Sequence, residues 1–310
     1  MMTTTFTPTA ACRQEVDLTN LLRGMAWLGC VSSRHVRELW LPHRTIDRAR
    51  TLLNRLYLQG VVEVYRWYVP RQELVQRRRD QRPIPAPPRR AGHWWTLTKK
   101  GLDLATTLAG EPLRSVGLRA PQLLAHDRLV VETLVQMIAL ARPHGLSGVY
   151  VEREALLNPP ARRPRMDAVI VLRLQPGQAT TWGVPWTAQP PLPREIAHRF
   201  ALEIDNATEG NNEITVKALA YRQAAQAAWA QRSAAFPLPV WVVPHPERRD
   251  RIHALWQQAW PDGQWLLTTE ADLHADRWLA YAGGMLCERP LFSQGTTSTH
   301  VHEGGEYAGT

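Results

Sequence analysis

The apolar residues of the N-terminal third recur at intervals of three and four positions, which is the spacing of amphipathic helices. This spacing predicts three helices, within residues 17–29, 34–41 and 44–60. A glycine or a proline ends each helix, and Ser32 or Ser33 can cap the second one. The expected buried face of the third helix consists of Ile46, Ala49, Leu53 and Leu56. Three helices with short connections are typical of a helix-turn-helix.

The pattern changes after Gly60. Residues 61–69 alternate between apolar and polar positions as a strand does, and residues 92–110 indicate a second strand followed by a helix. This order resembles a winged helix domain, in which the segment WTLTKKGLDL looks like the second wing strand and the helix after it. Residues 71–91 lie between the strands and contain seven arginines together with prolines, so we expect an irregular wing tip there.

A helix-turn-helix with a basic wing predicts contact with double-stranded DNA. The third helix would enter the major groove through Arg44, Thr45 and Arg48. The wing would place its arginines on phosphates or in the minor groove. The wing residues expected to do so are Arg77, Arg78, Arg79, Arg82, Arg89 and Arg90. The alternative is that this loop is only a solvated surface and that the helical unit serves dimerisation.

The C-terminal two thirds alternate between helical and strand-like patterns, which favours an α/β domain with a mixed sheet. A long amphipathic helix over 122–145 precedes three strands, a helix that opens at 211, and a strand over 236–244. The last of these strands is apolar throughout and is therefore expected at the centre of the sheet. Residues 247–260, 263–269 and 272–284 then predict a helix, a strand and a helix.

The charge of the 310-residue chain is divided unevenly. Residues 1–119 hold 20 Lys and Arg against 9 Asp and Glu, a net charge of +11, whereas the remainder holds 17 against 19, a net charge of −2. Nearly all of the overall excess of +9 therefore lies in the N-terminal third. Such an asymmetry indicates a polyanionic partner for that third, most often nucleic acid.

The cysteine content and the absence of long apolar runs predict a soluble cytoplasmic protein. The three cysteines, Cys12, Cys30 and Cys287, show no Cys-x-x-Cys spacing and are too few to staple a chain of this length. No run of 18 or more apolar residues appears, and the N-terminus lacks the layout of a signal peptide. We therefore expect no contact with a membrane.

Acidic residues and a lysine converge on two neighbouring strand-like segments of the α/β domain. Asp167 lies in the segment RMDAVIVLRL, and Glu203 and Asp205 lie in RFALEIDNATEG. Lys217 and Tyr221 follow four positions apart on the next predicted helix. Carboxylate oxygens are the ligands that hard divalent cations prefer, and a lysine can stabilise charge on a phosphate. The pattern therefore predicts a Mg²⁺ or Mn²⁺ site for phosphodiester chemistry, without an organic cofactor.

The chain resembles the replication-relaxation proteins, which include mobilisation relaxase-like proteins. The resemblance rests on AHDRLVVETL at 125–134, RPRMDAVIVL at 163–172 and FALEIDNATEGNNEITVKALAY at 200–221. With the helical region before them, it covers about residues 17–245. It implies an N-terminal winged helix joined to a domain related to the PD-(D/E)xK restriction-endonuclease-like nucleases.

The resemblance also assigns roles to individual residues. Asp167 stands where the nucleases have a strand aspartate, although Met166 replaces the proline that usually precedes it, and Glu203 stands for the acidic residue of the next strand. Asp205 occupies the place of the usual lysine, and Lys217 looks like that lysine moved to the following helix. These positions imply that Asp167, Glu203 and Asp205 hold the metal. Glu152 or Glu154, on the first predicted strand of this domain, is a further candidate to reach the metal.

The resulting hypothesis is a DNA-binding protein of plasmid or mobile-element replication and mobilisation that nicks DNA. Either a metal-activated water or Tyr221, as in relaxase-like chemistry, would attack the phosphate. One alternative is a non-catalytic replication or transcription regulator on a degenerate nuclease scaffold, and another is a protein-interaction domain. Structural interpretations are that Lys217 pairs with Glu213, that Tyr221 packs in the core, and that His126 and Asp127 brace their helix.

The predicted organisation has four parts. Residues 1–16 form a flexible N-terminus, and residues 17–112 form the winged helix DNA-binding domain. Residues 113–285 form the nuclease-like α/β domain, and residues 286–310 form a flexible tail.

Overall fold

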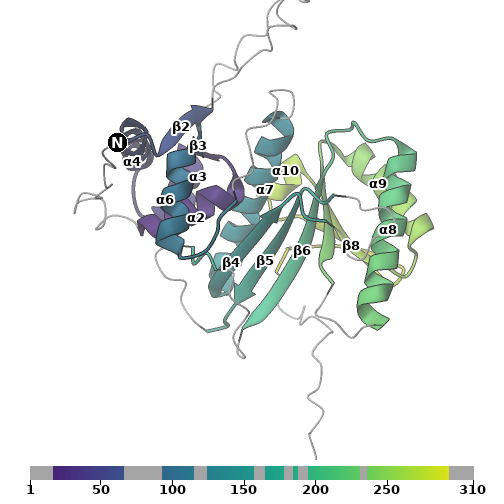
Figure 1. Ribbon diagram of the computed structural model, residues 1–310. Helices are drawn as coiled ribbons and strands as arrows, with labels where there is room; N and C mark the ends of the chain where they lie inside the picture. The colour runs from purple at the N-terminus through teal and green to yellow at the C-terminus, as the bar shows by residue number, and fades with distance from the viewer. Residues whose placement is uncertain are drawn as a thin grey trace, which may run out of the picture.

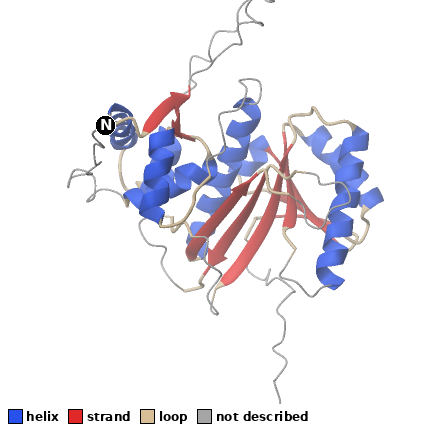
Figure 2. Cartoon of the chain, in the orientation of Figure 1, coloured by secondary structure: helices blue, strands red, loops and turns tan. Residues whose placement is uncertain are grey.

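The computed structural model describes residues 17–65, 93–114, 124–156, 165–177, 184–187, 195–230 and 236–292. A twisted sheet lies at the centre, a group of helices from the N-terminal third lies against one end of it, and α8 and α9 lie on the opposite side (Figures 1 and 2). The expected α/β architecture with a mixed sheet is confirmed. No helix in these ranges is both long and apolar enough to span a membrane.

The three helices predicted for the N-terminal third are present. Asp17 caps the first by accepting a hydrogen bond from the Asn20 backbone, and Ser32 caps the second in the same way at His35. Gly29 ends the first helix with a φ of 84°, a conformation that a glycine adopts without strain. The elements of this region are α2 (Leu18–Leu28), β1 (Val31–Ser32), α3 (Ser33–Trp40), α4 (Ile46–Leu58), β2 (Val62–Tyr65), β3 (Trp94–Leu97) and α6 (Lys99–Ala109).

The two strands predicted after Gly60 pair with each other, and the second of them, β3, also pairs with the short strand before α3. The order in this small sheet is β1-β3-β2, and both pairings are antiparallel. On α4, Ala49, Leu53 and Leu56 are buried as expected, whereas Ile46 is only partly so. The arginine-rich segment 71–91 lies outside the described residues.

The C-terminal region forms a seven-stranded sheet in the order β10-β9-β8-β7-β6-β5-β4. The strands β6, β7 and β8 are parallel, and the remaining neighbours are antiparallel. The predicted central position of the apolar strand β7 is confirmed. The elements are α7 (Leu124–Ala141), a 3-10 turn (Arg142–His144), β4 (Leu146–Arg153), β5 (Ala168–Leu174), β6 (Ile196–Ile204), α8 (Asn211–Ala230), β7 (Leu238–Val243), α9 (Pro246–Ala259), β8 (Gln264–Thr269), α10 (Glu270–His274), β9 (Trp278–Ala282) and β10 (Met285–Arg289).

The sheet separates two hydrophobic cores. Alternate side chains of a strand point to opposite faces, so Leu202 and Ile204 of β6 join the core under α7, whereas Ala201 joins the core under α8 and α9. Glu203 has the same parity as Ala201 and therefore points toward α8. The pleat of β6 thus directs a carboxylate into an apolar layer, where it requires polar partners.

The prediction of a helix over 272–284 is wrong. Only Glu270–His274 is helical, and residues 278–282 form β9, which turns through Gly283 and Gly284 into β10. Both glycines have positive φ, 57° and 87°, as the tight turns of two-residue hairpins require. The sheet therefore continues to Arg289, past residue 285, which we expected to be the last residue of the domain.

The N-terminal helices are docked on the sheet through the segment 184–187, which pairs with the β4 edge. Val149 of β4 donates to the carbonyl of Pro185 at 2.8 Å and accepts from Thr187 at 2.9 Å. The Trp186 ring lies 5.8 Å from those of Trp27 and Trp40. Side chains of the N-terminal helices and of the sheet consequently belong to one continuous core.

Candidate functional site

The candidate site lies at the sheet edge where β5 begins and β6 ends. Asp167 directly precedes β5 and Asp205 directly follows β6. Because these two strands are antiparallel, the start of one lies beside the end of the other. The Asp167 amide donates to the Leu202 carbonyl at 3.0 Å, and the Asp205 amide donates to that of Val242 at 3.1 Å. The expected carboxylates are therefore brought together by strand pairing.

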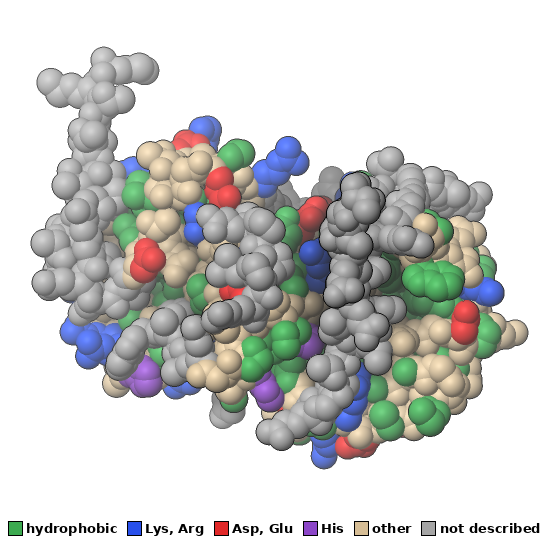
Figure 3. Space-filling model, turned by 90° about the horizontal axis from the view of Figure 1, so that it is seen from below, with side chains coloured by type: hydrophobic (Ala, Val, Ile, Leu, Met, Phe, Trp, Pro, Cys, Tyr) green, Lys and Arg blue, Asp and Glu red, His purple; other side chains and the backbone are tan. Residues whose placement is uncertain are grey.

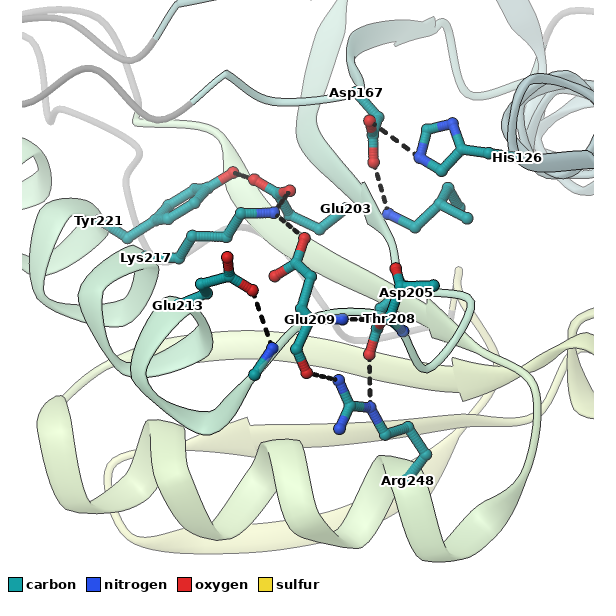
Figure 4. A network of polar contacts seen from close by, with 12 residues as sticks. His126, Asp167, Glu203, Asp205, Thr208, Glu209, Glu213, Lys217, Tyr221 and Arg248 are labelled. Atoms are coloured by element: carbon teal, nitrogen blue, oxygen red, sulfur yellow. Dashed lines mark hydrogen bonds and ion pairs between the residues drawn. The ribbon is translucent and has the colours of Figure 1, made fainter. Parts of the chain in front are cut away.

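Glu203 is the most deeply buried acidic residue of the site. Its side chain is 0% exposed, and both oxygens accept hydrogen bonds at 2.8 Å, Oε1 from the Tyr221 hydroxyl and Oε2 from Lys217 Nζ (Figure 4). Burial raises the pKa of Glu203 to about 7, although the Lys217 ammonium acts in the opposite direction. The Glu203 carboxyl can therefore gain or lose a proton near neutral pH.

The Lys217 ammonium lies between two carboxylates. Its Nζ is 2.8 Å from Glu203 Oε2 and 2.5 Å from Glu209 Oε1, and it lies over the Trp241 ring at 5.2 Å. Burial lowers the pKa of Lys217, but the two carboxylates outweigh it and raise the pKa above its usual value. Lys217 therefore stays a cation. The expected pairing with Glu213 does not form, because the Glu213 carboxylate accepts from the Gly210 amide at 2.8 Å.

Glu209 is a member of the site that sequence reasoning missed. Burial raises its pKa despite the neighbouring Lys217 ammonium. Its Oε1 accepts a hydrogen bond from Lys217 Nζ, whereas its Oε2 is buried and has no hydrogen-bond partner among the described residues. The segment DNATEG contains Glu209, but only the turn of the chain into α8 brings that side chain back onto Lys217.

Tyr221 lies one helical turn beyond Lys217 and is 0% exposed. Its ring packs against Trp256 at 5.3 Å and Phe236 at 6.2 Å. Burial, together with the adjacent Glu203, raises the pKa of Tyr221 well above its usual value. The structure therefore places this hydroxyl inside the core as a donor to Glu203.

The Asp167 carboxylate is held by one backbone and one side-chain donor. Its Oδ2 accepts from the Ile204 amide at 2.7 Å, and its Oδ1 lies 3.1 Å from His126 Nε2 (Figure 4). Burial lowers the pKa of His126, but the Asp167 and Asp127 carboxylates outweigh it and raise the pKa to about 9. Asp127 lies 3.9 Å away, so it acts through charge. Beyond bracing α7, His126 thus touches the site directly.

Asp205 shapes the loop between β6 and α8. Its Oδ1 accepts from the Thr208 and Glu209 amides at 3.0 and 3.3 Å, and its Oδ2 lies 2.5 Å from Nε of Arg248. Arg248, from the first turn of α9, also donates to the Glu209 carbonyl at 2.6 Å. Arg248 was missed because nothing in its local sequence distinguishes it from the arginine that follows. The pair fixes the loop that carries Glu209.

Of the two further carboxylates, Glu152 lies on β4 and Glu154 directly follows this strand. Glu152 accepts from the Tyr150 hydroxyl at 3.4 Å, and Glu154 pairs with Arg165 at 3.6 Å. Neither contact involves a residue of the candidate site. The structure therefore brings Asp167, Glu203 and Lys217 to one sheet edge, as the resemblance implies. The side-chain contacts of Glu152 and Glu154 given above do not join these residues.

The carboxylates do not fit a divalent cation in their present arrangement. All six oxygens of Asp167, Glu203 and Asp205 already face a donor of the protein. Within the part of the chain that the structure describes, no three His, Cys, Asp or Glu side chains form a group that could hold a metal. Lys217 and Arg248 instead neutralise the acidic charge.

The residues expected to contact DNA are only partly described. Arg44, Thr45 and Arg48 lie exposed at the start of α4, where Thr45 is the N-cap residue without a side-chain capping bond. Arg77, Arg78, Arg79, Arg82, Arg89 and Arg90 lie outside the described residues.

Comparison with protein families gives one finding that bears on function. The replication-relaxation family matches residues 22–238, more than half of the 310-residue chain. Comparison with curated proteins and with solved structures gave no match. The matched range includes α4 and the residues from His126 to Tyr221 of the site, whereas Arg248 lies beyond it. The chain therefore belongs to the replication-relaxation family, which indicates a role in plasmid or mobile-element replication or mobilisation.

Proposed function

We propose that this protein binds double-stranded DNA through a winged helix formed by its N-terminal third and nicks it with a PD-(D/E)xK-like C-terminal domain. The observation that carries the proposal is the buried Glu203–Lys217 pair beside Asp167 at one sheet edge. A fully buried carboxylate is costly and a hydrophobic residue would stabilise this position more readily, so the presence of Glu203 here points to chemistry. The membership of the replication-relaxation family supports DNA as the substrate.

The roles of the three residues follow from their charge states. Lys217 remains protonated and is 18% exposed, so its ammonium can move from the carboxylates toward a phosphate. Glu203 has a pKa of about 7 and can accept or return a proton near neutral pH. Asp167 is oriented by the Ile204 amide and by His126. Asp205 supports the loop through its bond to Arg248.

Mg²⁺ or Mn²⁺ remains part of the proposal as the cofactor that the resemblance implies. When bound, such an ion would act as a Lewis acid on the phosphate. Each oxygen of Glu203 and Asp167 already has one donor of the protein, so the ion would have to share these oxygens with donors such as Lys217 and His126 or displace them.

The test is to incubate the protein with Mg²⁺ or Mn²⁺ and a supercoiled plasmid that carries the origin region of its own replicon. The wild type should convert supercoiled into open circular DNA. The double variant Asp167→Ala/Glu203→Ala, checked for folding by circular dichroism, should not. Equal nicking by the two proteins would show that a contaminant, or another site, cuts the DNA.

Replacing Tyr221 by Phe discriminates between water and tyrosine as the nucleophile. Because the Tyr221 hydroxyl is fully buried and donates to Glu203, we expect water to attack and the variant to retain nicking within about tenfold. Denaturing gels of labelled DNA should show no covalent protein adduct in the wild type. A phosphotyrosine adduct that disappears in Tyr221→Phe would instead identify Tyr221 as the nucleophile.

DNA contact by α4 predicts a change in salt dependence. The double variant Arg44→Ala/Arg48→Ala should weaken binding and reduce the slope of log K against log salt by no more than about two, the value for two lost phosphate contacts. The triple variant Arg77→Ala/Arg78→Ala/Arg79→Ala should act in the same way through the proposed wing. Fluorescence anisotropy with a labelled duplex measures both.

A double variant on α9, Arg249→Ala/Arg251→Ala, is the matched control for loss of charge. It lies on the side of the sheet opposite α4 (Figure 1) and should leave the salt slope unchanged. On the face seen from below, Lys and Arg side chains lie scattered among acidic and apolar ones where side chains are coloured (Figure 3). If the α9 control lowers the salt slope as much as the α4 variant does, DNA binding depends only on the total positive charge, and α4 is not the DNA-binding element.

A second candidate function is a non-catalytic DNA-binding regulator of replication or transcription on a degenerate nuclease scaffold. The presence of a protein donor at every oxygen of Asp167, Glu203 and Asp205 favours it. Titration with Mn²⁺ discriminates between the two functions. Tight DNA binding without any Mn²⁺ binding that depends on Asp167 would select the regulator.

A further inference from the structure

Arg153 is a buried arginine at the end of β4 that neither the sequence pattern nor the family resemblance singles out. Its side chain is only 2% exposed. The guanidinium donates to three parts of the molecule: the C-terminal end of α2, the first turn of α7 and the residue that opens β5. These elements are separated by 125, 26 and 14 positions in the chain from Arg153.

The first contact joins Arg153 to the N-terminal region. Nη1 donates to the carbonyl of Leu28 at 2.9 Å, and Leu28 is the last residue of α2. The last carbonyls of a helix lack partners within the helix and carry the negative end of its dipole. A guanidinium is therefore a favourable partner at this place, and the bond depends on α2 remaining seated against β4.

The other two contacts join Arg153 to Asp167. Nε donates to the Asp167 carbonyl at 3.3 Å, and this oxygen also accepts from the Glu154 amide at 3.0 Å. Nη2 donates to Asp127 Oδ1 at 3.0 Å, and Asp127 is adjacent to His126, the side-chain partner of the Asp167 carboxylate. One guanidinium thus holds the backbone of Asp167 and the turn of α7 that supplies its partner.

We propose that Arg153 is a positioning residue: it orients Asp167 and His126 and makes their orientation depend on the seating of α2. The inference rests on the proposed function insofar as Asp167 serves DNA nicking. The planar fork of arginine is what permits this role, because it presents several donors in fixed directions. A lysine keeps the charge but has a single nitrogen, which cannot serve the three acceptors in the same geometry.

The experiment compares Arg153→Lys with Arg173→Lys. Arg173 is a matched control because it is also buried, lies near the other end of β5, and faces a carboxylate, Glu195 at 4.0 Å. Each variant is examined as the full chain by thermal unfolding and by NMR of ¹⁵N-histidine-labelled protein at one fixed pH. The His126 ring signal is assigned with His126→Gln. Nicking rates and affinity for a labelled duplex are measured on the same preparations.

Arg153→Lys should shift the His126 ring resonances and lower the nicking rate by about 10- to 100-fold, the usual effect of losing a residue that supports an active-site ligand. Its DNA affinity should stay within about threefold of the wild type, because no DNA contact is removed. Arg173→Lys should change neither the His126 signal nor the nicking rate. Asp127→Asn is the second variant if Arg153→Lys does not fold, and it should shift His126 in the same direction.

The NMR arm is independent of the proposed function. If the wild type does not nick DNA, a His126 shift in Arg153→Lys but not in Arg173→Lys still supports the structural role. Unchanged His126 resonances in folded Arg153→Lys overturn the proposal. So does a nicking rate equal to that of Arg173→Lys in a protein whose wild type is active.

Discussion

Substitution of Lys217 by Met is expected to lower the rate of DNA nicking by about 100- to 1,000-fold, the range seen when one preorganised charge-stabilising donor is removed from an active site. The ammonium is the cation nearest to Glu203 and Glu209, and it keeps its charge at neutral pH. Met has a similar length and packs in the same space, so the change removes the charge with little change in volume.

The variant should still fold. Without the ammonium, the pKa of Glu203 rises further above its present value of about 7, so this fully buried carboxyl becomes protonated. Glu209 also loses its cation, but its side chain is 21% exposed and can be hydrated. Lys99→Met is the control, because Lys99 is an exposed lysine on α6 that pairs with Asp103. Nicking is measured by plasmid relaxation and binding by anisotropy. Undiminished nicking by Lys217→Met would show that this lysine only neutralises its two partners.

Substitution of Arg248 by Met is expected to lower the free energy of unfolding by about 3–5 kcal/mol, as when one partner of a buried ion pair is removed. Asp205 would stay buried without its cation, and the Glu209 carbonyl would lose its donor. Because Asp205 and Glu209 lie in the same loop, nicking should fall together with stability. Urea unfolding followed by tryptophan fluorescence measures the change.

Arg251→Met is the matched control for this experiment. Arg251 lies one turn further along α9, is exposed, and donates to Asn211 at 2.7 Å. A surface substitution of this kind usually changes the free energy of unfolding by no more than about 0.5 kcal/mol. If both variants lose the same stability, the Asp205–Arg248 pair has no special role in holding the loop.

Local patterns predicted most of the elements correctly. The helix over 18–28 follows from its apolar spacing and from the signals at Asp17 and Gly29, which act within one turn of the chain. The central position of β7 follows from its continuous apolar sequence, which is typical of a strand that is buried on both faces of the sheet. The prediction of a helix over 272–284 failed because it too relied on local pattern. No glycine or proline before residues 278–282 signals the end of a helix, and the pairing of these residues with β8 cannot be read from neighbouring residues.

The candidate site was predicted only in part. The strand pattern correctly placed Asp167, Glu203 and Asp205 at one sheet edge, because the ends of paired strands meet there. It did not predict their partners. Asp205, expected on the metal, faces Arg248 from a helix that begins 41 residues later in the chain, and Asp167 faces His126 from a helix that precedes it.

Local sequence was enough to predict most of the helices and strands up to β8, the basic character of the N-terminal third and the acidic strand ends, since each depends on neighbouring residues or on composition. The pairing of the charged side chains, by contrast, depends on how the helices pack on the sheet. Lys217 reaches Glu203 and Glu209 instead of Glu213, because α8 packs on the face of β6 toward which Glu203 points. Arg153 joins α2, α7 and β5 for the same reason. Partners of buried charges are chosen by the packing of whole elements, because an ion that leaves water must find its counter-charge wherever the fold places one.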